Sequence, residues 1–383
     1  MIPYGKQDIN EEDINQVIDI LKSDWLTQGP KVPEFENSIT TYTGGRHAVA
    51  VTNGTSALHM ACLALGLTKG DVLWTSPTTF VASANCALYC GAKVDFVDID
   101  EKTYNISIQA LEKKLEDAKR ERCLPKIIIP VHMCGQPCDM KAIYELSKKY
   151  GFKIIEDASH AIGAEFKGQK IGNCKYSDIT TFSFHPVKII TSGEGGMALT
   201  NSKEVYEKML LIRSHGITSE PIEMQSRPDD EIWNYQQISL GYNFRMTDIQ
   251  AALGCHQMRR IDSFISQRRK IAKKYDVELS GLSCVIPFQN NDSLSSYHIY
   301  PIRIKPQENQ KKVYQLLRKE NIAVNIHYIP VYRQPYYEKL GFKIGYCPNA
   351  ESFFKETITL PIYPSLSNEQ QNFVIKTLEK LLS

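Results

Sequence analysis

The stretch HAVAVTNGTSALHMACLALGL, residues 47–67, decides the fold class. Its apolar start predicts a buried strand over 48–52, and Gly54 then turns the chain into a helix predicted over 56–65. A strand that leads through a short turn into a helix begins a parallel β-α-β unit.

The same alternation continues along the chain. Helices are predicted over 109–118 and 140–150, and upstream over 11–22 and 32–42. Further buried strands are predicted at 72–75, 93–97, 126–130, 153–156 and 179–183. Strands rich in β-branched residues that alternate with helices indicate an α/β fold with a mostly parallel sheet covered on both faces.

The alternation weakens after about residue 245. A single long helix is predicted over 248–274, followed by strands at 297–304 and 323–326 and helices at 309–320 and 368–382. We therefore expect a large α/β domain over 1–250. Residues 251–383 would form a linking helix and a smaller α+β C-terminal domain.

Composition excludes several classes of function. Hydrophobic residues make up 42% and charged residues 23%, with a formal net charge of +2, which is typical of a globular protein. No basic run interleaves with aromatic residues, so nucleic acid is not an expected partner. The ten cysteines form no CxxC pair, so we expect no metal site and reduced thiols in a cytoplasmic protein. No signal peptide and no membrane span are predicted.

NGTSAL, residues 53–58, is the first candidate site. Gly54, Thr55 and Ser56 stand where a helix begins, and free N–H groups at a helix N-terminus suit a phosphate. An ordinary helix cap explains the same residues, and on this motif alone the cap is the better interpretation.

IIEDASHA, residues 154–161, is the second. An apolar strand delivers Asp157 to its carboxyl end, where open α/β sheets bind ligands. A buried carboxylate there needs a cationic partner such as a protonated pyridine nitrogen. His160 could hydrogen-bond to that carboxylate and orient it. A capping Asp with a satisfied His is an equally good interpretation.

TFSFHPVKIITSGEGGM, residues 181–197, is the third. Lys188 has apolar neighbours on both sides, and desolvation would make its amine a nucleophile for a carbonyl. Ser183 could reach a phosphate oxygen. Phe80, in SPTTFVASAN, could stack on a cofactor ring, and core packing is the alternative if the other motifs do not form a cofactor site. GEGG is not GxGxxG, which argues against a dinucleotide site and an NAD-dependent oxidoreductase.

The three motifs together supply what an electron-sink cofactor needs: a phosphate anchor, an acid for the ring nitrogen and a lysine. At this point the sequence resembles the pyridoxal-phosphate (PLP) sugar aminotransferases of the DegT/DnrJ/StrS family. The resemblance runs from end to end. It is carried by NGTSAL, TSPTTFVASAN, IIEDASHAIGA, FSFHPVKIITSGEGG, RSHGI and LGYNFRMTDIQAALG.

The resemblance implies a fold-type I architecture and a homodimer with active sites at the interface. It implies that Lys188 forms the cofactor aldimine and that Asp157 contacts the pyridine nitrogen. Some family members are dehydratases with His at the lysine position, so Lys188 favours transamination. Family residues that contact PLP or its phosphate match Phe80, Gly54, Thr55, Ser183 and Asn243, the last reaching in from the neighbouring subunit.

A narrower resemblance, to the pseudaminic-acid branch of the family, is carried by SDWLTQGPKVPEFE and VNIHYIPVYRQPYY. It implies glutamate as amino donor, leaving 2-oxoglutarate, and a UDP-linked 4-keto-6-deoxy-N-acetylhexosamine as acceptor. Uridine contacts would depend on loops such as 219–237. Regions that contact the nucleotide sugar match Tyr4, Asp24, Trp25, Leu26, Thr27, Asn325, His327 and Tyr328.

Three alternatives remain at this level. One is an aminotransferase for another 4-keto nucleotide sugar, of the perosamine or 4-amino-arabinose type. The others are an NAD-dependent oxidoreductase and a non-catalytic binding protein with a PLP-enzyme fold.

Overall fold

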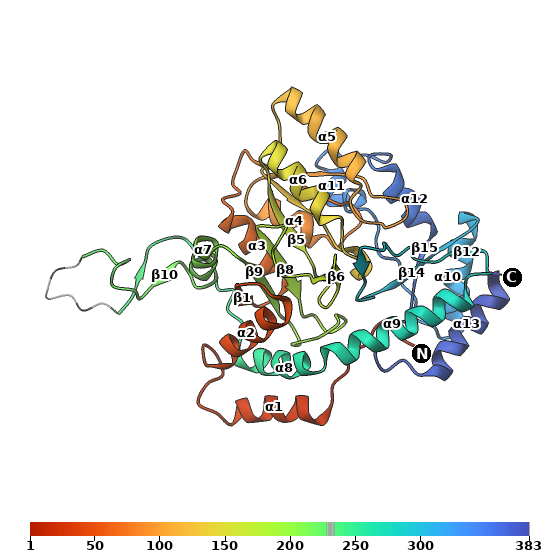
Figure 1. The fold of residues 1–383 in the computed structure, drawn as a ribbon, viewed down its shortest axis with the longest axis horizontal. Coiled ribbons are helices and arrows are strands. Elements are labelled where there is room, and N and C mark those ends of the chain that lie inside the picture. The colour runs from red at the N-terminus through yellow and green to blue at the C-terminus, as the bar shows by residue number, and fades with distance from the viewer. Residues whose placement is uncertain (227, 229–231, 233, 383) are drawn as a thin grey trace.

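A computed structural model describes all residues except 227, 229–231, 233 and 383. Its centre is a seven-stranded sheet (Figure 1). The strands are β1 (His47–Val51), β2 (Val72–Thr75), β3 (Lys93–Phe96), β4 (Ile127–Ile129), β5 (Lys153–Asp157), β8 (Ile179–Ser183) and β9 (Gly196–Thr200).

The strand order is β1-β9-β8-β5-β4-β2-β3. Strands β8, β5, β4, β2 and β3 are parallel neighbours, and β9 pairs antiparallel with both β1 and β8. The predicted α/β fold with a mostly parallel sheet is confirmed, and the predicted strands lie where the sheet has them. Strand β9 was not predicted.

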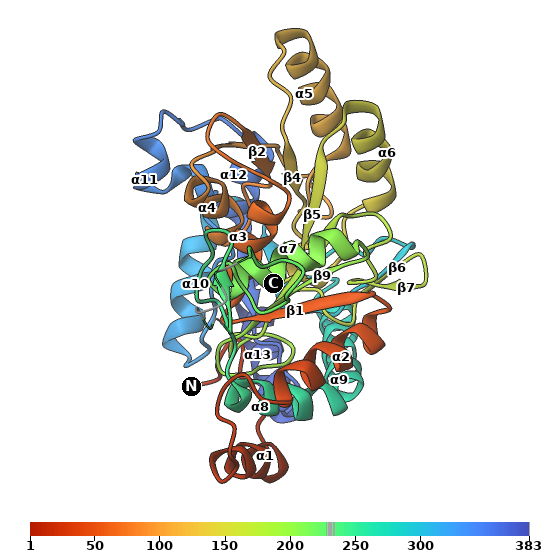
Figure 2. The same cartoon turned by 90° about the vertical axis from the view of Figure 1, so that its left-hand side faces the viewer.

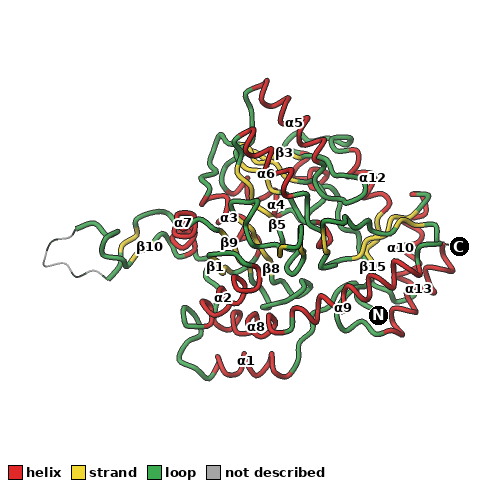
Figure 3. The backbone as a smooth tube through the Cα atoms, in the orientation of Figure 1, coloured by secondary structure: helices red, strands yellow, loops and turns green. Residues whose placement is uncertain are grey.

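Helices cover both faces of this sheet, as the separate layers in Figures 2 and 3 show. Helix α5 (Ile108–Glu121) packs by one side only, because its buried residues recur at helical spacing: Leu111, Leu115 and Ala118. One core cluster includes residues of α2 (Lys31–Thr43), α5 (Ile108–Glu121), α6 (Met140–Tyr150) and α8 (Asp248–Arg259). The other includes residues of α3 (Gly54–Ala64), α4 (Ala82–Tyr89) and α7 (Lys203–Arg213).

A smaller α+β unit follows, and α9 (Ile261–Glu278) runs towards it (Figure 1). The predicted single helix over 248–274 is wrong, because α8 ends at Arg259 and Arg260, with φ −105° and ψ 0°, separates it from α9. The unit contains β12 (Cys284–Val285), β14 (Tyr300–Ile304), β15 (Thr357–Leu360), α10 (Gln310–Lys319) and α13 (Asn368–Leu382).

The strand predicted at 323–326 is also wrong. Asn325 meets Thr359 of β15 in a single bridge, and the chain then leaves the sheet to line a cavity. Further elements of the described chain are α1 (Glu11–Leu21), β6 (Glu165–Phe166), β7 (Gln169–Lys170), η1 (Met133–Gly135), β13 (Ser293–Leu294), η2 (Gln307–Asn309), η3 (Val331–Arg333), α11 (Pro335–Glu338) and α12 (Pro348–Glu356).

Two short strands, β10 (Ile217–Thr218) and β11 (Gln236–Gln237), pair in an arm that extends away from the body (Figure 1). The arm carries the 219–237 loop, on which uridine contacts were expected to depend. Residues 227, 229–231 and 233 of that loop lie outside the described residues.

Two segments connect the large and small units. Ile2 forms a parallel bridge with Ile322, and the N–H of Ile362 donates to the carbonyl of Tyr4. Buried residues between 331 and 353 pack into the core cluster beneath α3 and α4. The division into domains at residue 250 therefore stays a prediction.

Candidate active site

A cavity of about 730 Å³ opens where several strands of the main sheet end. Asn53 follows β1, while Asp157 and Ser183 are the last residues of β5 and β8. This is the edge at which open α/β sheets bind ligands. The wall includes Tyr4, Asn53, Gly54, Thr55, Thr79, Phe80, Ser83, Asp157, Ser159, His160, Ser183, Lys188, Glu194, Asn325, His327, Tyr328 and Gln334.

The N-terminus of α3 forms one wall. Asn53 is the cap residue, and its side-chain oxygen accepts the backbone N–H of Ser56 at 2.8 Å. Ser56 itself lies outside the cavity wall, because its hydroxyl bonds to Thr52 at 3.0 Å. Gly54 and Thr55 do line the cavity, so the free N–H groups of the first turn lie where an anion could bind them.

Ser183 lies against this first turn. A Cβ atom added to Gly54 would stand 2.9 Å from the Cβ of Ser183 and 3.2 Å from its hydroxyl oxygen. Glycine is therefore required here by close approach, and the hydroxyl of Ser183 and the start of α3 face a common point.

Asp157 is buried beside this cradle. Its carboxylate accepts the Ser83 hydroxyl at 2.6 Å and the Ser159 N–H at 3.1 Å. The Thr79 hydroxyl lies 2.8 Å from that of Ser83 and can donate to it in turn. The hydrogen bond expected from His160 is replaced by these donors.

Lys188 lies in the loop between β8 and β9, half-buried in the cavity wall. Burial lowers the pKa of its amine to about 8, and the nearby Asp157 carboxylate acts in the opposite direction. A lysine with such a pKa has a substantial neutral fraction near neutral pH, and the neutral amine is the nucleophile.

His160, His327 and Tyr328 line the same cavity as Lys188. Burial, together with the charges of Lys188 and His327, keeps the pKa of His160 well below its usual range. The Tyr328 hydroxyl lies 3.4 Å from Nε2 of His160, and Nδ1 of His160 has no hydrogen-bond partner among the described residues. Tyr4 packs its ring 5.3 Å from that of His327.

The other candidates divide into two groups. Phe80 lines the cavity with 59% of its surface exposed, so its ring is open to a ligand. Asn243 is exposed at the base of the arm, outside the cavity of its own chain, where it pairs with Ser214. Also outside that cavity are Asp24, Trp25, Leu26 and Thr27.

Sequence reasoning did not single out Ser83, Ser159 or Asn53. Ser83 stands three residues after Phe80, near the start of α4, and both residues line the cavity. The cap role of Asn53 was equally visible, since Asn is a preferred cap residue.

The DegT/DnrJ/EryC1/StrS aminotransferase family model matches residues 7–379. The chain belongs to this family. A UDP-4-amino-4,6-dideoxy-N-acetyl-beta-L-altrosamine transaminase of Campylobacter jejuni is 37% identical and covers 100% of this chain and 98% of its own. The GDP-perosamine synthase of Escherichia coli O157:H7 is 34% identical, covering 100% and 99%.

Two solved structures carry the comparison further. The PMP form of the sugar aminotransferase Spr1654 from Streptococcus pneumoniae is 30% identical with a TM-score of 0.89, covering 100% of this chain and 99% of its own. Helicobacter pylori PseC, an aminotransferase of pseudaminic acid biosynthesis, is 30% identical with a TM-score of 0.89, covering 99% and 98%. The protein is a PLP-dependent sugar aminotransferase of fold-type I, which excludes the oxidoreductase interpretation.

The cavity fits this cofactor. A phosphate matches the α3 N-terminus beside Ser183, a protonated ring nitrogen matches the Asp157 carboxylate, and an aldehyde matches the amine of Lys188. The unpartnered Nδ1 of the buried His160 is a further polar atom that a ligand can satisfy.

Two further findings concern the described residues. They contain no group of three His, Cys, Asp or Glu side chains arranged to hold a metal ion. Across the same residues, no helix is both long enough and apolar enough to cross a membrane.

Proposed function

We propose that this aminotransferase transfers the amino group of glutamate to the 4-keto group of a UDP-linked 4-keto-6-deoxy-N-acetylhexosamine. The product is UDP-4-amino-4,6-dideoxy-N-acetyl-beta-L-altrosamine, which places the enzyme in pseudaminic acid biosynthesis. The observation that carries the proposal is the amine of Lys188 facing a cavity that also holds Asp157, in a chain similar over its whole length to the Campylobacter transaminase.

The cofactor is held at three points. The N–H groups of Gly54 and Thr55 and the hydroxyl of Ser183 bind its phosphate. The ring of Phe80 covers one face of the pyridine. Because these residues come from different elements, they would hold the cofactor from more than one side.

Asp157 meets the ring nitrogen and keeps a proton on it. The two donors on the carboxylate, Ser83 and the N–H of Ser159, fix its orientation while leaving lone pairs for the ring N–H. When bound, PLP supplies a conjugated ring that stores the electron pair released during proton removal.

Lys188 is the residue that moves the proton. Its lowered pKa suits a group that must take a proton from the amino acid and later return one to the sugar carbon. His160, His327 and Tyr328 enclose the amine and limit the access of water.

Tyr4, Asn325 and His327 line the cavity, and Tyr4 and Asn325 would offer polar groups to the sugar nucleotide. Asn243 and the 24–27 segment lie outside the cavity of their own chain. We therefore infer a homodimer in which Asn243 of each subunit reaches the phosphate in the other.

The first experiment is an absorbance spectrum of the purified enzyme with PLP, repeated after adding glutamate. The near-visible band of the bound cofactor should be converted to a pyridoxamine-type band at shorter wavelength. Lys188→Ala should abolish turnover. No band with added PLP, or full turnover by Lys188→Ala, would contradict the assignment of the site.

A second candidate is an aminotransferase for another 4-keto nucleotide sugar, and the similarity to GDP-perosamine synthase favours testing it. Turnover should be compared for UDP-, GDP- and dTDP-linked 4-keto sugars at equal concentration. A clear preference for a GDP-linked or dTDP-linked sugar would replace the proposed substrate and leave the aminotransferase intact.

A further inference from the structure

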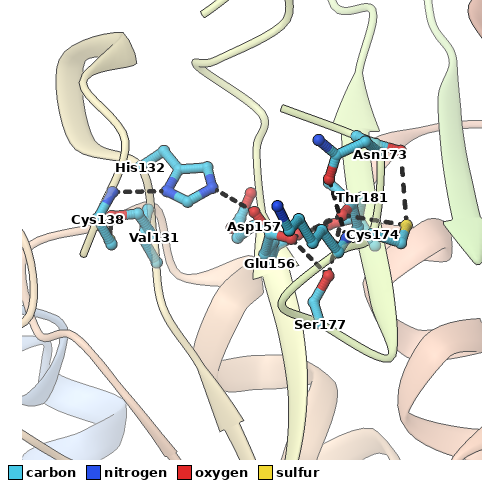
Figure 4. Close-up of polar contacts among 12 residues, drawn as sticks. Val131, His132, Cys138, Glu156, Asp157, Asn173, Cys174, Ser177 and Thr181 are labelled. Atoms are coloured by element: carbon cyan, nitrogen blue, oxygen red, sulfur yellow. Dashed lines mark hydrogen bonds and ion pairs between the residues drawn. The ribbon is translucent and has the colours of Figure 1, made fainter. Parts of the chain in front are cut away.

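A buried polar network lies immediately behind Asp157. Glu156 precedes it on β5, so the two side chains point to opposite faces of the sheet. Asp157 lines the cavity, whereas Glu156 is 3% exposed and is not part of the cavity wall. Figure 4 shows Glu156 between His132 on one side and Ser177 on the other.

Both oxygens of the Glu156 carboxylate accept hydrogen bonds. One oxygen accepts the hydroxyls of Thr180, at 3.0 Å, and of Ser177. The other accepts Nε2–H of His132 at 2.8 Å. Within the described part of the chain, no Lys or Arg is among the hydrogen-bond or ion-pair partners of Glu156.

His132 is held in one tautomer. Its Nδ1 accepts the backbone N–H of Cys138 at 3.1 Å, so the ring proton lies on Nε2 and points at Glu156. The backbone N–H of His132 also donates to the carbonyl of Asp157 at 3.1 Å. His132 therefore holds Glu156 through a hydrogen bond from its ring and Asp157 through a hydrogen bond from its main chain.

The main chain around Asp157 is fixed on its other sides too. Its N–H donates to the carbonyl of Pro130 at 3.0 Å, and the Thr181 hydroxyl donates to the carbonyl of Glu156 at 3.2 Å. Strand pairing alone would tolerate an apolar residue at position 156, and apolar residues often replace buried charges without loss of stability. Stability of the sheet therefore does not by itself explain why a charged residue with polar partners stands at position 156.

We propose that Glu156 and His132 are positioning residues for Asp157. By holding the Glu156 side chain and the Asp157 carbonyl, they set the angle at which the Asp157 carboxylate meets the ring nitrogen of PLP. This inference rests on the proposed role of Asp157. It assigns a task to a charged network that touches neither the cofactor nor the substrate.

The test compares purified variants for PLP affinity, for the pH midpoint of the bound cofactor's absorbance change, and for thermal unfolding without cofactor. His132→Phe keeps the ring volume and removes both hydrogen bonds of the imidazole. His132→Gln places an amide N–H where Nε2 was, so it is the conservative rescue. Thr180→Val removes one donor from Glu156 with little change of shape.

A matched control is available at Glu351. It is 6% exposed and accepts the Tyr332 hydroxyl and the N–H of Gly345, both at 2.7 Å, far along the chain from Asp157. Glu156→Gln and Glu351→Gln therefore make the same chemical change at similar burial. Only the first should alter the behaviour of the cofactor.

We expect His132→Phe to weaken PLP binding about tenfold, as loss of a buried charge-assisted hydrogen bond implies, and to shift the absorbance midpoint. His132→Gln should restore most of both, and Thr180→Val and Glu156→Gln should show smaller changes of the same sign. Glu351→Gln should change thermal unfolding alone.

Unchanged PLP affinity and midpoint in the His132, Thr180 and Glu156 variants would overturn the inference if Asp157→Asn changes both quantities. The proposed role of Asp157 would survive that result. If Asp157→Asn also changes neither quantity, the role of Asp157 and the inference built on it both fail. Should His132→Phe not fold, Thr180→Val and Glu156→Gln decide the question by the same criteria.

Discussion

The lowered pKa of Lys188 predicts how fast the cofactor-free protein captures PLP at different pH values. Only the neutral amine attacks an aldehyde. With a pKa of about 8, about one-tenth of Lys188 is neutral at pH 7 and about nine-tenths at pH 9. The capture rate should therefore rise about tenfold between these values and then level off.

The assay is stopped-flow absorbance with PLP in excess over the cofactor-free protein, between pH 6.5 and 10. A blocked lysine amide in the same buffers is the reference, because PLP has titrating groups of its own. An amine with an ordinary pKa near 10.5 gains about a hundredfold between pH 7 and 9 and continues to rise. A protein rate that rises in parallel with this reference up to pH 10 would refute the assignment of a desolvated amine.

The same experiment separates the two influences on Lys188. Burial lowers its pKa, and the negative charge of Asp157 raises it. Asp157→Asn removes the second influence, so the levelling-off should begin at a lower pH than in the unmodified protein. A shift to higher pH would mean that Asp157 does not act on the amine as the structure places it.

Three further predictions test other parts of the structure. Gly54→Ala should weaken PLP binding about tenfold in an absorbance titration, since its Cβ would stand 2.9 Å from the Cβ of Ser183; unchanged affinity would place the phosphate elsewhere. Arg268→Met should lower the free energy of unfolding by about 3 kcal/mol in urea denaturation, because the buried guanidinium donates to three backbone carbonyls. Gly163→Ala should cost about 2 kcal/mol in the same assay, as its φ of +77° and the Ile265 methyl 1.9 Å from the new Cβ both oppose a side chain. Adding Ile265→Val should recover part of that loss.

Local pattern was sufficient for much of the fold. The strands around Asp157 and Ser183 and the helix after Gly54 were predicted from apolar runs and turn residues, and the sheet class followed from their alternation. The break at Arg260 was not visible, because no Gly or Pro marks it. Its guanidinium bonds to Asp8 and Asp13, contacts that only the folded chain creates.

The residues of the candidate site also divide into those that the sequence predicts and those that only the folded structure reveals. Lys188 and Asp157 could be predicted from the sequence because each is a charged residue in apolar surroundings near the end of a strand. The partners of Asp157 could not be predicted in this way. Ser83 lies on α4, far from Asp157 in the sequence, and the network around Glu156 depends on the register between β4, β5 and β8. Single residues with unusual chemistry can be found in a sequence, whereas the groups that orient them are set by tertiary packing.

The pairing of Ile2 with Ile322 has a consequence for the way the protein is made. Contacts between residues so distant in sequence form slowly, since the loop between them must close first. During synthesis the segment that carries Tyr4 leaves the ribosome long before its partners near residues 322 and 362. The wall of the cavity that Tyr4 supplies therefore forms only after those partners emerge, and a nascent chain can assemble the phosphate cradle well before it can enclose a sugar.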